Sequence, residues 1–391
     1  MTAAARADVA TGTVMCVVGA RPNFIKIAPV LAALAAHTPR VTAVLVHTGQ
    51  HYDQAMSEQL FADLRLPRPD LNLEVGSGSH AIQTAEVMRR FEPTLEAHRP
   101  ACVVVVGDVN STLACALVAA KKGVPVIHVE AGLRSFDRRM PEEINRVLTD
   151  QIADRLYITE RSAAVNLERE GIAAERIAFV GNVMIDSLLL HKPNARPACA
   201  TLQHHGADPT LLDGPEGYAL VTLHRPSNVD KVGTLGAILS VLADVAGRLP
   251  LVFALHPRTR ANIERFGLAQ LIDPRRIAVL PPQGYLETLG LMTGATLVLT
   301  DSGGMQEEST ALGVPCLTLR DNTERPITVE QGTNTIVGTD RATILACVDD
   351  ILAGRGKRGR VPELWDGHAG QRIAADLWQW LQAPALVVRA A

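Results

Sequence analysis

The chain has 391 residues, of which 47% are hydrophobic and 20% charged, and its formal net charge is −3. This length corresponds to two or three domains, and this composition excludes a disordered, collagen-like or coiled-coil chain. The charge argues against general affinity for nucleic acid or an anionic membrane. No apolar run approaches the ~20 residues that cross a bilayer, and no signal peptide is evident. We therefore expect a globular protein with neither a nucleic-acid nor a membrane partner.

The six cysteines are scattered and form no C-x-x-C pair: Cys16, Cys102, Cys115, Cys199, Cys316 and Cys347. Metal sites and disulfide frameworks need clustered cysteines or a secretory context, and neither is present. Most of these cysteines lie in apolar segments, where a thiol behaves as a small hydrophobic group. The pattern predicts buried free thiols, no metal site and a cytoplasmic protein.

Short apolar runs alternate with helix-length segments through the first half of the chain. The expected strands are Val14–Val18, Val41–Val46, Cys102–Val106, Val124–His128, Arg155–Ile158 and Ile177–Val180. They are continuously apolar, as is typical of parallel strands covered on both faces. The expected helices between them are Ile25–Ala36, His80–His98, Ser111–Lys122, Glu142–Ala153 and Ser162–Glu170. This alternation predicts a doubly wound parallel sheet.

A segment rich in Pro, Gly and Ala, His191–Gly217, interrupts the alternation and is typical of a domain boundary. Strands are expected again at Tyr218–Leu223, Leu251–Leu255, Ile277–Leu280, Thr296–Leu299 and Val314–Leu319. We predict an α/β protein of two Rossmann-like, doubly wound domains that face a central cleft, residues 1–190 and 191–369. The last helix, in residues 370–391, can pack back on the first domain.

Polar side chains follow most of the predicted strands. Gly107-Asp108 follows one strand of the first half, and His224 and His256 follow strands of the second half. Open α/β sheets bind ligands beyond the carboxyl ends of their strands. These residues are therefore expected to line the cleft, and we expect at least one of the two histidines to touch the substrate.

Gly303 and Gly304 follow Asp301-Ser302 and precede a helix, with Glu307 and Glu308 expected in its first turn. Glycines let backbone N–H groups approach a phosphate at a helix N-terminus. A carboxylate beside such a site suits a ribose diol. The pattern fits a nucleoside diphosphate, and the alternative is an ordinary strand-to-helix turn.

Arg21 and Lys26 lie on the first β-α turn, and Arg325 lies in a loop of the second half. Cations flanking a helix start suit a pyrophosphate. The turn lacks G-x-G-x-x-G, so no dinucleotide cofactor is inferred. The alternative is that these are solvated surface cations.

Three carboxylates, Asp108, Glu130 and Glu142, are expected in one half of the cleft. Carboxylates that share a cleft raise one another's pKa, which suits general acid and base roles. Mg²⁺ binding is the competing interpretation, although the nearby cations could neutralise phosphates without a metal. Glu142, which follows Pro141, can also be only a helix N-terminal charge.

The sequence resembles the non-hydrolysing UDP-N-acetylglucosamine 2-epimerases, which have a two-domain fold of the glycosyltransferase-B type. The resemblance runs from about residue 18 to residue 373, through GARPNFIKIAPV, TGQHYD, GDVNSTLACALVA, PVIHVEAGLRSFDRRMPEEINR, GNVMIDSL, LVTLHRPSNVD, ALHPRTR, TDSGGMQEESTALGVPCLTLRDNTERP and WDGHAGQRI. HVEAGLR with PEEINR, followed by TDSGGMQEE with TERP, is a highly specific combination.

The resemblance implies reversible epimerisation at C2 of UDP-N-acetylglucosamine to UDP-N-acetylmannosamine. UDP is eliminated to give a 2-acetamidoglucal and then adds back, without a redox cofactor. The family's catalytic positions fall on Asp108, Glu130, Glu142 and His224. Its substrate contacts fall on Arg21, Lys26, Arg146, His256, Ser302, Gly303, Gly304, Glu308 and Arg325. The motifs do not decide which carboxylate removes the C2 proton.

Departures from the family pattern concern activation by a second UDP-N-acetylglucosamine. Tyr52 and Asp53 stand where many members have Arg after the histidine, and Pro226 replaces a second Arg. Because Asp53 adds a negative charge to that pocket, we expect weak or absent activation. A homodimer is also expected. A hydrolysing relative, a glycosyltransferase of the same fold and a non-enzymatic nucleotide-sugar sensor are the alternatives.

Overall fold

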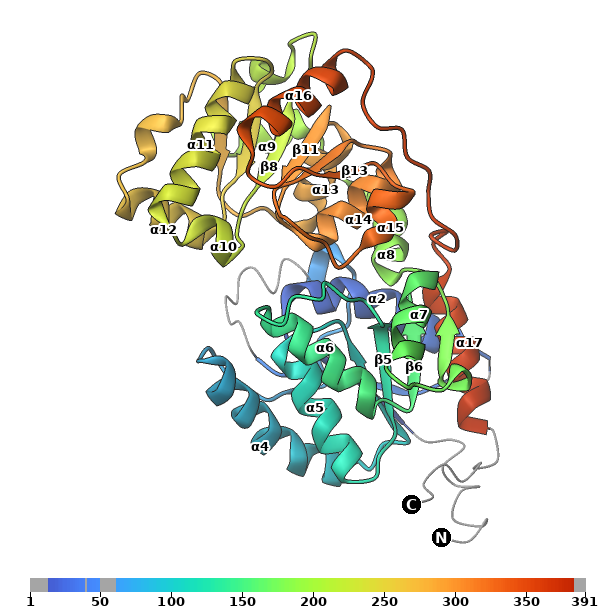
Figure 1. Ribbon diagram of the computed structural model, residues 1–391. Coiled ribbons are helices and arrows are strands. Elements are labelled where there is room, and N and C mark those ends of the chain that lie inside the picture. The colour runs from blue at the N-terminus through green and yellow to red at the C-terminus, as the bar shows by residue number, and fades with distance from the viewer. Residues whose placement is uncertain (1–12, 39–40, 50–60, 383–391) are drawn as a thin grey trace, which may run out of the picture. The chain divides into compact units, whose positions relative to one another are not determined.

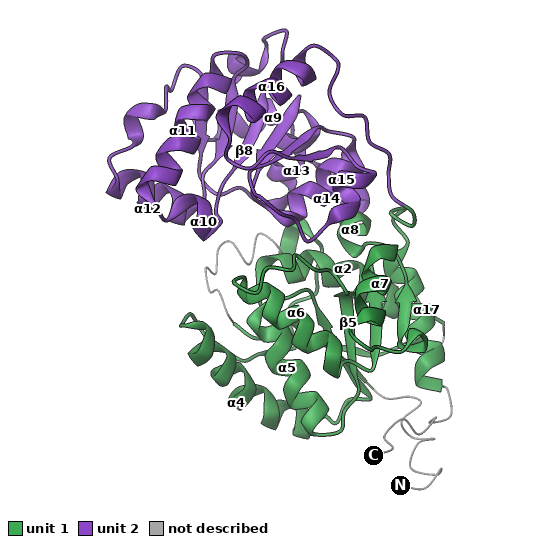
Figure 2. Cartoon of the chain, viewed as in Figure 1, with its two compact units in different colours: residues 1–187, 363–391 green, residues 188–362 purple. Residues whose placement is uncertain are grey.

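The computed structural model describes residues 13–38, 41–49 and 61–382. The chain divides into two compact units, shown in Figure 2: unit 1 comprises residues 1–187 and 363–391, and unit 2 comprises residues 188–362. Each unit contains a parallel sheet with helices between its strands (Figure 1), so the predicted α/β class is confirmed.

The described residues of unit 1 form a seven-stranded parallel sheet in the order β3-β2-β1-β4-β5-β6-β7. The strands are β1 Val14–Val18, β2 Ala43–His47, β3 Leu71–Asn72, β4 Cys102–Val106, β5 Val126–Ala131, β6 Arg155–Ile158 and β7 Ile177–Phe179. β1 and β4 are fully buried, as continuously apolar strands require. The strand order reverses between β1 and β4, and ligands of doubly wound sheets bind at such a reversal.

Helices cover both faces of this sheet (Figure 1). They are α2 Arg21–Ala36, α4 His80–His98, α5 Asn110–Lys121, α6 Pro141–Ile152, α7 Arg161–Arg169 and α17 Ala369–Gln382. α4, α5 and α6 pack side by side on one face, and α17 packs against α2 on the other. α8 Val183–His191 leads from unit 1 into unit 2.

The described residues of unit 2 form a six-stranded parallel sheet in the order β10-β9-β8-β11-β12-β13. The strands are β8 Ala219–Thr222, β9 Leu251–Ala254, β10 Ile277–Leu280, β11 Leu297–Thr300, β12 Cys316–Thr318 and β13 Asn334–Ile336. The helices are α9 Ala198–His204, α10 Pro226–Val229, α11 Val232–Ala246, α12 Pro257–Arg265, α13 Tyr285–Thr293, α14 Gly303–Leu312, α15 Pro326–Glu330 and α16 Arg341–Leu352. Here the order reverses between β8 and β11.

The helix α17 is anchored to unit 1 by buried polar contacts. The carboxylate of Asp186 accepts hydrogen bonds from the first two backbone N–H groups of α17, at 3.1 Å from Ala369 and 2.7 Å from Gly370. The Tyr157 hydroxyl on β6 donates to Asp376 on the same helix at 2.9 Å. An acidic group at a helix N-terminus satisfies N–H groups that have no partner within the helix. The end of the described chain therefore completes the first sheet's helical layer.

Three sequence expectations about elements need correction. The strand expected to end at His128 continues to Ala131 as β5. The segment His191–Gly217, expected to be irregular, contains α9 and two short 3₁₀ turns. The short strands β3 and β13 were not predicted, because two or three residues carry too little hydrophobic pattern. Within the described part of the chain, no helix is long and apolar enough to cross a membrane.

Candidate active site

Asp108 lies in the turn between β4 and α5, directly after Gly107, whose φ is +68°. The carboxylate of Asp108 is a quarter exposed and forms an ion pair with Arg146 on α6, which is almost fully buried. Arg146 also contacts Glu143, with 2.5 Å between Nη1 and Oε2. The guanidinium is therefore fixed between two carboxylates and orients the more exposed one, Asp108.

Glu143 was not among the candidate residues predicted from the sequence. This carboxylate is 1% exposed and accepts hydrogen bonds from the Ser135 backbone N–H at 3.0 Å and from the Phe136 N–H at 2.9 Å. The spacing of three residues between Glu143 and Arg146 on a helix was the available signal. Glu142 lies in the first turn of α6, as predicted, and is half-buried. The two adjacent glutamates thus differ. Glu143 stabilises the loop after β5 through hydrogen bonds, and Glu142 is the more accessible of the two.

Glu130 lies within β5. The sequence had suggested a position after this strand, because the strand was expected to end at His128. Its φ is +72°, and the register with β6 shifts between Val129 and Ala131, which marks a β-bulge. The buried Glu130 carboxylate forms an ion pair with Lys26 of α2. Backbone strain of this kind is found at functional sites, where surrounding contacts hold it in place. The bulge presents Glu130 to the lysine of a different element.

Gly107, Lys26 and Glu130 form one cluster at the β1–β4 reversal. A Cβ on Gly107 would lie 3.0 Å from the Lys26 Nζ and 3.4 Å from the Glu130 Oε2, so the glycine leaves room for the ion pair. Asn23 joins the neighbouring turn to this cluster, because its side chain accepts from the Ala20 N–H at 2.9 Å and donates to the Val106 carbonyl at 2.9 Å. The structure thus brings together two residues that the sequence named separately.

Arg21 is the first residue of α2, four residues before the expected start of that helix at Ile25. Pro22 follows it, and proline is favoured in the first helical turn because its missing N–H needs no partner there. Arg21 is half-buried, whereas Lys26, in the second turn, is buried. Among the two predicted phosphate contacts, Arg21 is therefore the more accessible.

His224 and Asp301 form a pair in unit 2. The distance between the His224 Nδ1 and the Asp301 Oδ1 is 3.1 Å, and the histidine side chain is 38% exposed. Asp301 also accepts from the backbone N–H groups of His224 at 3.1 Å and Arg225 at 2.9 Å. Burial alone would raise the pKa of Asp301, but these donors hold that pKa below its usual value. With Nδ1–H donating to a carboxylate, Nε2 of His224 is the nitrogen left for a ligand.

His256 lies beside His224, with 5.7 Å between the ring centroids, and it is the N-cap of α12. Its Nδ1 accepts a hydrogen bond from the Arg258 backbone N–H at 3.2 Å. Unit 2 therefore brings the two predicted histidines together. Pro226, the departure from the family pattern, begins α10. The segment Gln50–Asp53 lies outside the described residues.

Ser302 is the N-cap of α14, and Gly303 and Gly304 form the start of that helix. A Cβ on Gly303 would lie 2.5 Å from the Arg325 Nη1, so this position accepts only glycine without movement of the guanidinium. Glu308 is 6% exposed and lies in the second helical turn, as does Glu307. The expectation that both glutamates lie in the first turn is wrong.

Arg325 is buried against α14 and lies between two carboxylates. Its Nε is 2.8 Å from the Glu307 Oε2, and its Nη1 is 2.7 Å from the Glu324 Oε1. Arg320 adds a second cation, 2.8 Å from the Glu324 Oε2. A buried guanidinium held at both ends keeps one orientation, with its Nη1 against Gly303.

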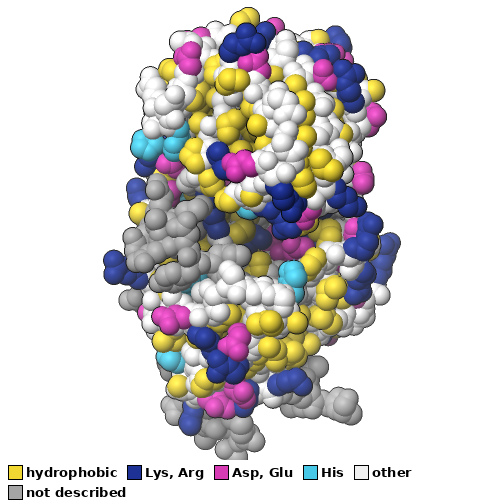
Figure 3. All heavy atoms as spheres, turned by 90° about the vertical axis from the view of Figure 1, so that its left-hand side faces the viewer, with side chains coloured by type: hydrophobic (Ala, Val, Ile, Leu, Met, Phe, Trp, Pro, Cys, Tyr) yellow, Lys and Arg dark blue, Asp and Glu magenta, His cyan; other side chains and the backbone are white. Residues whose placement is uncertain are grey.

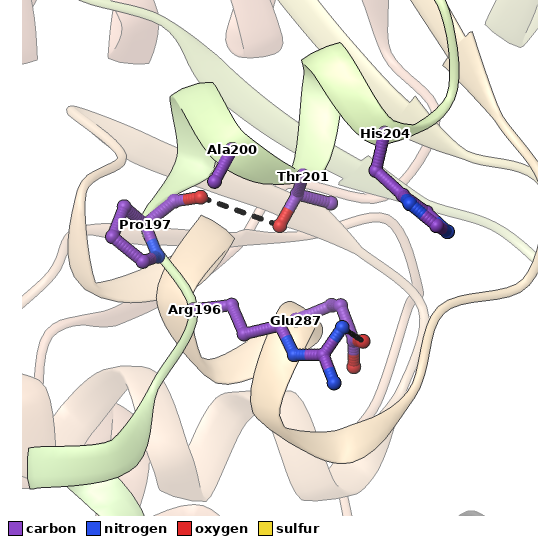
Figure 4. Close-up of a pocket in the computed structure, with 6 residues that line it drawn as sticks. All are labelled: Arg196, Pro197, Ala200, Thr201, His204 and Glu287. Carbon is purple, nitrogen blue, oxygen red and sulfur yellow. Dashed lines mark hydrogen bonds and ion pairs between the residues drawn. The ribbon is translucent and has the colours of Figure 1, made fainter.

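The cavity in Figure 4 is separate from these clusters. It measures about 210 Å³ and lies between α9 and α13, lined by Arg196, Pro197, Ala200, Thr201, His204 and Glu287. An ion pair of 2.9 Å joins Arg196 and Glu287 across it. None of the predicted site residues lines this cavity, and ligand pockets are generally larger. In the described ranges, no group of three or more His, Cys, Asp or Glu is arranged to hold a metal ion.

Comparisons with known proteins agree with the resemblance in sequence. Residues 33–377 match the family described as UDP-N-acetylglucosamine 2-epimerase. The chain is 39% identical over 363 residues to the UDP-N-acetylglucosamine 2-epimerase of Methanococcus maripaludis, covering 91% of this chain and 96% of the relative. It is 42% identical over 364 residues to the UDP-2,3-diacetamido-2,3-dideoxy-D-glucuronate 2-epimerase of Pseudomonas aeruginosa, covering 92% and 98%.

A solved structure with the same fold is that of the Methanocaldococcus jannaschii UDP-GlcNAc 2-epimerase in complex with UDP-GlcNAc and UDP. Its TM-score is 0.84 at 40% identity, and the match covers 93% of this chain and 99% of that one. The match extends over both sheets. This chain is an epimerase of the UDP-N-acetylglucosamine 2-epimerase family.

Proposed function

We propose that this protein interconverts UDP-N-acetylglucosamine and UDP-N-acetylmannosamine without hydrolysis. UDP leaves in an elimination that gives 2-acetamidoglucal, and it then adds back. The proposal depends above all on the environment of Glu130, a buried carboxylate at a β-bulge with positive φ that pairs with Lys26. Strain and a buried charge are costly to maintain, and they concentrate where chemistry needs them.

The elimination breaks two bonds of the sugar. A base takes the proton from C2, and the C1–O bond breaks so that UDP leaves with its electron pair. Re-addition delivers a proton to C2 on the opposite face, and a UDP oxygen attacks C1. Epimerisation therefore requires two proton-transfer groups, one for each face of C2.

Asp108 and Glu130 are the two carboxylates that we assign to these roles. Both are in unit 1, Asp108 after β4 and Glu130 within the neighbouring strand β5, and each has a different cation: Arg146 beside Asp108 and Lys26 beside Glu130. The two carboxylates thus lie in different surroundings, which suits one role as acid and one as base. Glu142, half-buried in the first turn of α6, is the third catalytic candidate.

The nucleotide contacts are assigned to the cations and helix starts. Arg21 and Lys26 in unit 1 suit the diphosphate. In unit 2, the N–H groups at the start of α14 suit phosphate oxygens, and Glu308 suits the ribose. The remaining proposed contacts are His224, His256, Ser302, Gly303, Gly304 and Arg325, with His224 as the fourth catalytic candidate. Arg146 acts by holding Asp108.

A second candidate substrate is UDP-2,3-diacetamido-2,3-dideoxy-D-glucuronate. It is favoured by the Pseudomonas relative, which is as similar to this chain as the relatives named for UDP-N-acetylglucosamine. Both sugars carry the acetamido group at C2, so the same elimination applies to each. The substituents at C3 and C6 separate the two candidates.

The test is incubation of the purified protein with each nucleotide sugar in D₂O, followed by NMR. We expect interconversion of the C2 epimers, with deuterium at C2 and no added cofactor. Release of free N-acetylmannosamine as the sole product would assign the protein to the hydrolysing class. Turnover only when an acceptor is present would favour a glycosyltransferase, and binding without turnover would favour a sensor.

Substitution of the carboxylates tests the residue assignments. Asp108→Asn, Glu130→Gln and Glu142→Gln are each expected to lower kcat by at least ~10²-fold, the scale of lost acid–base catalysis. Glu363→Gln is the matched control, because Glu363 forms an exposed ion pair with Arg161 in the same unit. Near-normal turnover in all three site variants would refute the assignment.

We also propose a homodimer. Figure 3 shows apolar side chains exposed on one face of the molecule. Among the exposed large apolar residues of unit 1 are Phe136 at 74%, Ile144 at 42% and Leu148 at 45% exposure. Ile144 and Leu148 are four residues apart on α6 and share one helical face. Light scattering should give twice the chain mass, and Leu148→Glu should reduce it. A monomeric wild type would refute the proposal.

A further inference from the structure

His128 is a fully buried histidine of β5 that the mechanism above does not use. The distance between its Nδ1 and the Asp150 Oδ1 on α6 is 2.6 Å, and the distance between its Nε2 and the Gly107 carbonyl oxygen is 2.8 Å. Each ring nitrogen therefore faces an oxygen. The backbone carbonyl can only accept a hydrogen bond, so Nε2 carries a proton.

Asp150 is surrounded by donors. Its Oδ2 accepts from the Gly132 N–H at 3.1 Å and is 2.7 Å from the Arg134 Nη2. Burial raises the pKa of this carboxyl, but the His128 ring and the Arg134 guanidinium outweigh burial and hold the pKa below its usual value. An ionised Asp150 can only accept, so Nδ1 of His128 also carries a proton.

The charges around the ring alternate in sign. Arg134, beside Asp150, forms a two-point contact with Glu170, at 2.8 Å from Nε and 2.6 Å from Nη2. A cationic His128 completes two positive and two negative groups in this chain, of which only Glu170 is partly exposed. Balanced pairs with saturated hydrogen bonds are the form in which buried charge is tolerated.

We propose that His128 is a positioning residue, held as a doubly protonated imidazolium, that fixes the Gly107 turn and thereby the Asp108 carboxylate and the Lys26–Glu130 pair. The inference rests on the catalytic roles proposed for those carboxylates. The Gly107 carbonyl accepts from His128, and its N–H donates to the Val129 carbonyl at 3.0 Å. Both polar backbone atoms of this glycine are thus held by β5.

The position of Gly107 explains why this restraint reaches the site. Asp108 is the next residue in the chain. On its other side, Gly107 approaches Lys26 so closely that a Cβ on the glycine would lie 3.0 Å from the Lys26 Nζ. A glycine with φ of +68° would otherwise have wide conformational freedom. The charged donor on its carbonyl gives a stronger hydrogen bond than a neutral one. Loss of the His128–Gly107 hydrogen bond would free the turn that positions Asp108. The same turn contacts Lys26, the partner of Glu130.

The protonation state is tested by NMR of the protein labelled with ¹⁵N-histidine, with His128→Gln used to assign the signals. We expect both ring nitrogens of His128 to be protonated at pH 7.5. A signal pair typical of one protonated and one bare nitrogen would overturn the proposal. This measurement does not depend on catalysis, so it stands even if UDP-N-acetylglucosamine is not turned over.

The positioning role is tested by hydrogen exchange and kinetics of His128→Gln. We expect faster amide exchange at Gly107, and a kcat lowered about 10- to 100-fold with KM changed less than about threefold, because a misplaced carboxylate costs rate more than binding. Tyr157→Phe, which removes a buried hydrogen bond to Asp376 elsewhere in unit 1, is the stability control and should leave both unchanged. Unchanged exchange at Gly107 would overturn the positioning role, and absent wild-type turnover would instead contradict the proposed function.

Discussion

Gly303→Ala tests whether the start of α14 is built around the Arg325 guanidinium. The new Cβ would lie 2.5 Å from the Arg325 Nη1 and 2.7 Å from the Glu324 Oε1, about 1 Å inside the ~3.5 Å of a normal contact. Arg325 cannot retreat freely, because its Nε is 2.8 Å from the Glu307 Oε2. We expect the overpacking to lower the free energy of unfolding of unit 2 by about 1–3 kcal/mol. At about 2–4 °C per kcal/mol, the melting temperature should fall by roughly 2–12 °C.

Calorimetry of UDP binding measures the functional consequence of this substitution. A methyl group at the proposed phosphate site, together with a displaced Arg325, should weaken UDP binding by about 10-fold or more, which corresponds to ~1.4 kcal/mol. Gly233→Ala is the control: a Cβ there meets nothing within 4 Å, and alanine in a helix should stabilise by ~0.5–1 kcal/mol. Wild-type melting and UDP affinity in Gly303→Ala would refute the reasoning.

Three further predictions concern charge, packing and the turn. Asp301→Asn should lower the free energy of unfolding at pH 7 by about 1–3 kcal/mol. Because the folded pKa of Asp301 is depressed, its contribution to stability is present above the ordinary value of 3.8 and is lost as pH falls through the folded pKa. Denaturant unfolding from pH 7 to pH 3 should therefore show a shrinking difference in free energy of unfolding between the wild type and Asp301→Asn. A constant difference would contradict this prediction. Gly370→Ala places a Cβ 2.6 Å from the Pro29 carbonyl oxygen and should cost about 1–3 kcal/mol in urea unfolding, whereas a cost near zero would show that α17 shifts easily. Gly107→Ala combines φ of +68° with a Cβ 3.0 Å from the Lys26 Nζ and should lower kcat about 10- to 100-fold, and normal turnover would place the reacting atoms elsewhere.

The architecture was largely predictable from hydrophobic pattern. Fully buried parallel strands are continuously apolar, and the limits predicted for Cys102–Val106 and Arg155–Ile158 are those of β4 and β6. The helix His80–His98 was also predicted to its ends, and in the structure Ser79 caps its start and a left-handed Arg99 terminates it. Local signals of this kind lie within a few residues of the element that they define.

The candidate site was predictable as a set of residues but not as a set of contacts. The Lys26–Glu130 pair joins positions 104 residues apart, and nothing local indicates it. The bulge that turns Glu130 out of register depends on the pairing of β5 with β6. Arg325 was expected to be a cation that contacts phosphate. In the structure it forms ion pairs with two buried carboxylates. Partners across elements follow from tertiary packing, which a single sequence does not display.

The attachment of α17 to unit 1 has a consequence for the order of folding during synthesis. Unit 2 is one continuous stretch, residues 188–362, and every strand of its sheet has been translated before α17 begins at Ala369. Unit 1 gains α17, and the helix N-terminus that meets Asp186, only after all of unit 2 has been translated. Domains fold as their residues emerge from the ribosome at about 5–20 residues per second. Unit 1 is therefore begun before unit 2 but completed after it. The apolar face of α2 stays without its covering helix for about 10–40 s after residue 187 is made.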